Sequence, residues 1–167
     1  MSWSDYHRRH AALDGVLEHL RHNPGGAIPF TGEVADLFDS PGQVLLALQY
    51  RWTLKLTGRV GLAQSDAERE PGVDLVDAVT RAWLDTATEH ALLRAVLDAH
   101  TTASPEVLRP GLEGEQRMLA LAAGLAGPAD ARAEITRVGA AFTALLRTTP
   151  PRRRPVRHFA RRLAASA

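Results

Sequence analysis

The stretch that decides the fold reads SPGQVLLAL and spans residues 40–48. Ser40 is placed to cap a helix, Pro41 follows at the first helical position, and Gln43 stands where it can complete a capping box. The next five residues make every side of a helix apolar, which predicts a central, largely buried helix. We expect it to cover residues 41–57 and to end at Gly58.

A second serine–proline start occurs at Ser104 and Pro105, and apolar residues elsewhere recur at the three- and four-residue spacing of amphipathic helices. Pro110 is expected to kink or restart the helix it lies in. Besides the helix over 41–57, the pattern predicts helices over about 4–22, 31–38, 73–85 with a continuation through 100, 105–124 and 128–148.

Three local expectations complete this assignment. Thr31 is expected to cap the second helix, and Thr86 with Glu89 to cap the continuation that follows residue 85. Residues 59–72 are rich in Gly, Asp, Glu and Pro, which is typical of a mobile surface loop.

Composition supports an all-α fold. Aromatic residues make up only 5% of the chain, so the core must come mostly from Leu, Val and Ala, which favour helices over a β-sandwich. The length of 167 residues suits one domain. We therefore predict a single-domain bundle of about six to seven mostly antiparallel helices, with no sheet.

The composition also limits the function classes. The chain has no cysteine, which excludes disulfides, thiolate nucleophiles and cysteine-ligated metals. No run approaches the roughly 18 apolar residues of a membrane span, and the polar start does not resemble a secretory signal, so we expect a cytoplasmic protein. Lys55 is the sole lysine, and this arginine bias favours a bacterial, GC-rich source.

Residues 149–167 form an Arg-rich tail behind the predicted bundle of residues 1–148. The 20 basic residues divide into six in the tail and 14 in the bundle, which also holds all 19 acidic residues, so the net charges are +6 and −5. Helical spacing would make the tail amphipathic, as either a docked helix or a flexible end. The residues predicted to contact a partner are Arg152, Arg153, Arg154, Arg157, Phe159, Arg161, Arg162 and Leu163.

Residues 33–51 resemble bacterial DNA-binding helix-turn-helix segments, with a small Ala35, a short turn, a Ser-Pro start and an apolar Val44. The second helix of such a motif needs polar side chains to reach base edges. Leu45 and Leu48 stand there instead, and burying each in a core is favourable by roughly 1.5–3 kcal/mol. The segment is therefore predicted to be two tightly joined core helices.

Candidate chemistry elsewhere is sparse. The first predicted helix carries His7, His10, Asp14, Glu18, His19 and His22, but His7 and His22 would lie about 22 Å apart and cannot share one metal ion. His10 falls on the apolar side, where a hydrogen-bonded core histidine is the commoner role. Four aromatic residues could line a small pocket or simply fill the core: Tyr50, Trp52, Trp83 and Phe142.

The sequence favours a non-catalytic function by protein–protein contact, with another protein or a second copy as partner. Nucleic acid is an alternative partner for the arginine tail. A small-molecule binder or enzyme with an interhelical pocket is the other alternative. No nucleotide-binding, serine-hydrolase or zinc-protease motif occurs, and no cofactor is predicted.

Overall fold

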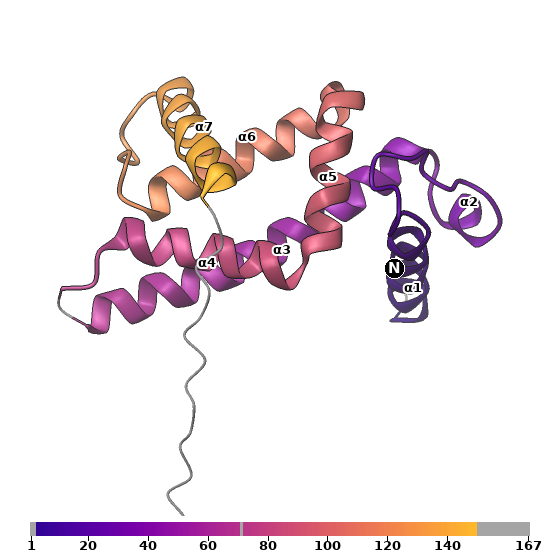
Figure 1. Ribbon diagram of the computed structural model, residues 1–167, viewed down its shortest axis with the longest axis horizontal. Helices are drawn as coiled ribbons and strands as arrows, with labels where there is room; N and C mark the ends of the chain where they lie inside the picture. The colour runs from indigo at the N-terminus through magenta and orange to yellow at the C-terminus, as the bar shows by residue number, and fades with distance from the viewer. Residues whose placement is uncertain (1–2, 71, 150–167) are drawn as a thin grey trace, which may run out of the picture.

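Helix α3 (Pro41–Arg69) is the longest of the seven helices in the computed structural model, which describes residues 3–70 and 72–149 (Figure 1). The described part of the chain holds no strand, which confirms the all-α prediction. The predicted tail contacts, from Arg152 to Leu163, lie outside the described residues. The other helices are α1 (Trp3–His19), α2 (Glu33–Leu37), α4 (Leu75–Glu89), α5 (Ala91–Ala103), α6 (Pro105–Ala122) and α7 (Arg132–Thr148).

Helix α3 begins as its sequence predicts. Pro41 occupies the first position, and the Ser40 hydroxyl oxygen accepts a hydrogen bond from the backbone N–H of Gln43 at 3.3 Å. Val44, Leu45 and Leu48 are buried. This helix contacts α1, α4, α5 and α6, so it is the element around which the others pack (Figure 1).

The predicted end of α3 at Gly58 is wrong, and so is the predicted loop over residues 59–72. The helix continues through Gly58 to Arg69 and lies beside α4 (Figure 1). A glycine inside a helix costs about 1 kcal/mol relative to alanine. Burial of Val60 and a hydrogen bond from the Gln64 side chain to the carbonyl of Ala122, at 3.2 Å, outweigh that cost.

The predicted caps at Thr86 and Glu89 are also wrong, because both residues lie inside α4. The Thr86 hydroxyl donates to the carbonyl of Ala82, four residues earlier, at 2.7 Å. The chain turns instead at His90, where φ is −117° and ψ is 41°, so α4 and α5 are separate helices.

Three smaller differences concern helix starts and Pro110. Gly32 occupies the cap position of α2 in place of Thr31, with φ of 56°. Helix α7 begins at Arg132 instead of near residue 128. Pro110 lies inside α6 without ending it. Proline has no backbone N–H, so the carbonyl of Glu106 lacks its usual helical donor at position 110. Glu106 is exposed in the first turn, where water can donate to that carbonyl instead.

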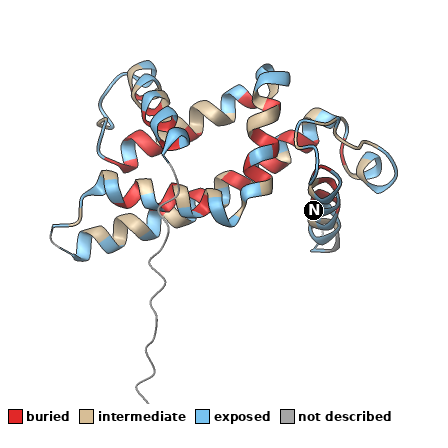
Figure 2. Cartoon of the chain, in the orientation of Figure 1, coloured by how far each residue is buried: buried red, intermediate tan, exposed pale blue. Residues whose placement is uncertain are grey.

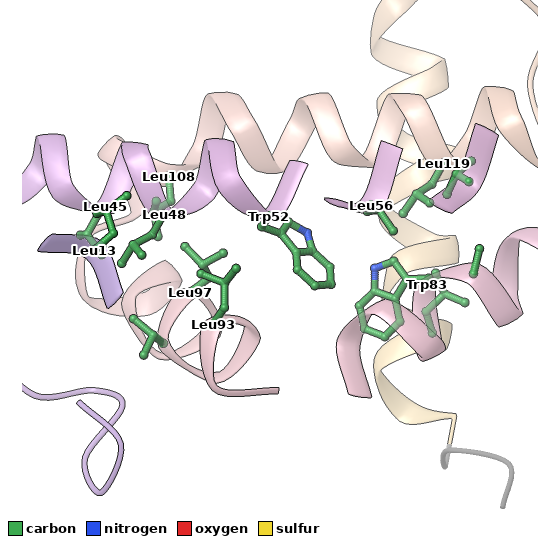
Figure 3. Packing of buried hydrophobic residues seen from close by; sticks show 14 of the residues in the cluster. Leu13, Leu45, Leu48, Trp52, Leu56, Trp83, Leu93, Leu97, Leu108 and Leu119 are labelled. Atoms are coloured by element: carbon green, nitrogen blue, oxygen red, sulfur yellow. The ribbon is translucent and has the colours of Figure 1, made fainter. Parts of the chain in front are cut away.

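One hydrophobic cluster joins all the helices, and α3 contributes the most buried members, followed by α1, α4, α5 and α6 (Figures 2 and 3). Trp52 is fully buried near the middle of α3. Leucines flank it along the same helix, Leu45 and Leu48 before it and Leu56 after it (Figure 3). The core therefore follows the inner face of α3.

Helices α6 and α7 meet at an unusually close point. A Cβ atom built on Gly139 would lie 2.0 Å from the carbonyl oxygen of Gln116, which is far inside contact distance. Gly139 is therefore required because only a residue without a side chain lets α7 cross the α6 backbone there.

We predict that Gly139→Ala lowers the free energy of unfolding by at least about 1–3 kcal/mol, because the methyl group forces the two helices apart. Gly114→Ala is the matched control: Gly114 lies in α6 with nothing within 4 Å of the new Cβ. It should raise the free energy of unfolding by about 0.5–1 kcal/mol. Urea denaturation measures both, and equal effects would contradict the close crossing.

Candidate functional site

A buried carboxylate lies at the centre of the bundle. The side chain of Glu115 on α6 is only 3% exposed. Its Oε2 accepts a hydrogen bond from the indole N–H of Trp52 at 2.9 Å, and its Oε1 accepts one from the indole N–H of Trp83 at 3.1 Å. In Figure 3 both indole nitrogens face the space between the two rings. One carboxylate thus connects α3, α4 and α6.

Arg94 on α5 extends this network. Its Nη1 lies 3.5 Å from Oε2 of Glu115, and its side chain is 9% exposed. The guanidinium also lies over the Trp52 ring, 4.9 Å from the ring centre, and donates twice to Asp98, at 2.7 and 3.1 Å. Arg147 of α7 pairs with the same Asp98 at 3.2 Å. The buried negative charge is therefore balanced and fully hydrogen-bonded.

Sequence reasoning missed Glu115 and Arg94. The available signal was that Glu115 stands seven residues after Leu108 and four before Leu119, which places an acid on the apolar side of α6. Trp52, Trp83 and Phe142 are core residues, as one of the two interpretations predicted, whereas Tyr50 is 65% exposed. Because Glu115 and Arg94 are buried and bonded to residues of other helices, this pair holds helices together.

A cationic cavity opens next to this network. It lies where α3 faces the α4–α5 junction and α1, and its volume is about 190 Å³. Leu17 of α1 forms part of its wall, as do the first residues of α5. Its charged or titratable lining residues are Arg51 and Lys55 of α3, together with Glu89 and His90 of the junction.

Desolvation is the first cause that lowers the pKa of His90 below its usual value of 6.5, and the nearby Lys55 charge is the second. Arg51 and Arg59 act in the same direction, whereas Glu89, whose carboxylate lies 3.6 Å from His90 Nε2, opposes them. Positive charge therefore dominates the field at His90.

An apolar surface lies on another side of α3. Tyr50 and Leu54 are exposed there, and the same face continues through Thr57 to Gly61 at alternating spacings of four and three. Gly61 lines a groove of about 540 Å³ between α3 and α6, together with Thr57, Val60, Gln64, Met118, Leu121 and Ala122. No charged residue is among them. We call Tyr50, Leu54 and this groove the apolar face of α3.

The helix-turn-helix segment and the histidine-rich first helix were the other candidates in the sequence. Residues 33–51 form α2 and the first part of α3, with Leu45 and Leu48 buried in the core. Among residues 3–70 and 72–149, no three His, Asp or Glu side chains gather as a metal ion would require. His10 is half-buried, with its ring centre 5.3 Å from that of Tyr6.

No helix in the described part of the chain has the length and apolar character needed to cross a membrane. Comparison with known protein families, with curated proteins and with solved structures gives no match to this chain.

We predict that Glu115→Gln lowers the free energy of unfolding by about 3–5 kcal/mol, because it leaves Arg94 without its buried counter-charge and one indole N–H without an acceptor. Glu113→Gln, two residues earlier on α6, changes the same group in a pair with Arg117 at 3.6 Å. That control should cost about 0–1 kcal/mol. Similar losses in the two variants, measured by chemical denaturation, would contradict the network.

The lowered pKa of His90 makes stability depend on pH. Just below pH 6.5 the unfolded chain binds more protons at His90 than the folded chain does. The free energy of unfolding therefore has its full value from His90 above pH 6.5 and decreases as the pH falls below 6.5. His90→Asn should flatten this pH slope. Lys55→Gln should raise the pKa of His90, measured by NMR titration of the imidazole; a lower or unchanged pKa would contradict the assignment.

Proposed function

We propose that this chain is a non-catalytic helical protein that acts by protein–protein contact, and that two copies associate through the apolar face of α3. The observation that carries the proposal is the exposure of that face: Tyr50 is 65% and Leu54 55% exposed on the longest helix of the bundle, next to an uncharged groove. Exposed apolar patches beside a groove are typical of interaction surfaces.

The partner is a second copy because this face is complementary to itself. In an antiparallel pair of α3 helices related by a two-fold axis near residues 57 and 58, Leu54 of one copy faces Gly61 of the other. Gly61 has nothing within 4 Å of a Cβ position, so it leaves a hollow for that leucine. Two-fold interfaces require the same surface to provide both protrusion and hollow.

Charge supports the same pairing. The groove contains no charged side chain, so two identical surfaces approach without like-charge repulsion at the centre. Thr57 and Gly58, at the crossing point, are small and exposed, which lets the helices come close.

The Arg-rich tail is a second proposed contact. Residues 152–163 carry six arginines beside Phe159 and Leu163, and residues 1–148 carry a net charge of −5. In a dimer, the tail of one copy could pair with the acidic bundle of either copy, and a nucleic-acid backbone is the alternative acidic partner.

Sedimentation of the full chain is the test. We expect the wild type at twice its chain mass of 18.1 kDa, and Leu54→Glu and Gly61→Glu as monomers. Each places a carboxylate in the uncharged centre of the interface, where an unpaired charge is costly. Gly61 is helical and open, so Gly61→Glu is expected to leave folding intact or improve it.

Two exposed positions on other helices provide matched controls. Gly15→Glu on α1 and Leu145→Glu on α7 make the same chemical changes away from this face and should remain dimeric. A monomeric wild type at its highest soluble concentration would overturn the proposal. So would dissociation on truncation after Pro151 together with dimeric Leu54→Glu and Gly61→Glu variants, which would assign the contact to the tail.

A further inference from the structure

The cationic cavity of about 190 Å³ between α3 and the α4–α5 junction has more positive charge than its own acids neutralise. Arg51 and Lys55 stand one helical turn apart on α3, and Arg59 follows one turn later. Arg51 pairs with Asp14 of α1 at 2.6 Å, and Arg59 pairs with Glu89. Lys55 has no ion-pair or hydrogen-bond partner among the described residues.

Arg51 also has unused hydrogen-bonding capacity. Its Nη1 donates to Asp14, but its buried Nε–H has no acceptor within the described residues. Lys55 thus offers a charge without an ion-pair partner, and Arg51 places a second cation on the same wall of the cavity.

The opposite wall adds a favourable field. Helix α5 starts at Ala91, with His90 before it as a cap residue that makes no side-chain hydrogen bond. The first N–H groups of a helix have no acceptor within it and carry partial positive charge. Ala91, Leu92 and Leu93 all line the cavity, so this end of α5 faces the same space as Lys55.

We propose that the cavity binds the oxyanion group of a small organic molecule, a carboxylate or a phosphate, between Lys55, Arg51 and the start of α5. The site is independent of the proposed dimer, because it lies on another side of α3. The apolar part of the ligand contacts Leu17 and Leu92, which belong to the same lining.

The volume limits the ligand. A volume of about 190 Å³ holds an anionic group with a short apolar portion, and any larger part of the ligand would extend from the open side of the cavity into solvent. Recognition is therefore by charge and size at one small group.

Glu89 is the internal competitor for this site. Its carboxylate lines the cavity, pairs with Arg59 and lies 3.6 Å from His90 Nε2, so it already occupies part of the positive field. A bound oxyanion must share the cavity with it. Removing the charge of Glu89 should therefore strengthen anion binding. The increase in affinity should exceed the one expected from a change of one unit in the net charge of the whole protein.

The experiment is calorimetric titration of the full chain with inorganic phosphate and, separately, with acetate. We expect saturable binding of at least one, about tenfold weaker binding in Lys55→Gln, and about threefold to tenfold tighter binding in Glu89→Gln. Binding of phosphate alone would assign a phosphate ligand, and binding of acetate alone a carboxylate.

Arg69→Gln is the matched control because Arg69 lies on the same helix, 14 residues from Lys55, in an exposed pair with Asp66. It makes the same change in net charge and should leave affinity unchanged. The proposal is overturned if neither anion saturates, if Arg69→Gln weakens binding as much as Lys55→Gln, or if Glu89→Gln does not tighten it. Circular dichroism of each variant confirms that it is folded.

Discussion

The fold depends on satisfying one buried carboxylate. Glu115 has almost no contact with water, and an unpaired charge in that position would cost several kcal/mol. Its oxygens therefore require the indole N–H of Trp52 and of Trp83, while Arg94 supplies the balancing charge. These three donors come from α3, α4 and α5, so a single acid on α6 sets the relative positions of four helices. Apolar burial drives their association, but it is non-directional and does not by itself select one arrangement.

The starts of α3 and α6 could be predicted from the sequence, whereas the end of α3 could not. Ser40 with Pro41 acts through local hydrogen bonding and a fixed backbone angle. At α6 the Ser104 side chain makes no capping hydrogen bond, and Pro105 marks the start by its backbone angle alone, so neighbouring residues suffice to find both starts. The end of α3 depends on residues far along the chain. Gly58 is a weak helix former, yet contacts of α3 with Glu89 and Ala122 hold residues 59–69 in the helix. Such contacts leave no trace in a window of local sequence.

The cationic cavity could not be predicted for the same reason. Arg51 and Lys55 are separated from His90 by more than 30 residues, and the cavity forms where the chain turns at His90 and the start of α5 meets this part of α3. With the break between the two helices predicted at Thr86, no local pattern places residues 89–93 against Arg51 and Lys55. The central network differs, because Glu115 stood on an apolar side of its helix and that pattern was visible in the sequence.

Three faces of α3 have three different surroundings. Successive residues of an α-helix differ in direction by about 100°, so Leu54, Lys55 and Leu56 point to three separate sides of α3. Leu56 belongs to the core, Leu54 to the exposed apolar face, and Lys55 to the cationic cavity. A second copy packed on Leu54 would leave the cavity at Lys55 open. The proposed dimer and the proposed anion site are therefore compatible in one molecule. The Glu115 network supports both surfaces, because its hydrogen bond to Trp52 fixes the middle of α3, the helix that carries them.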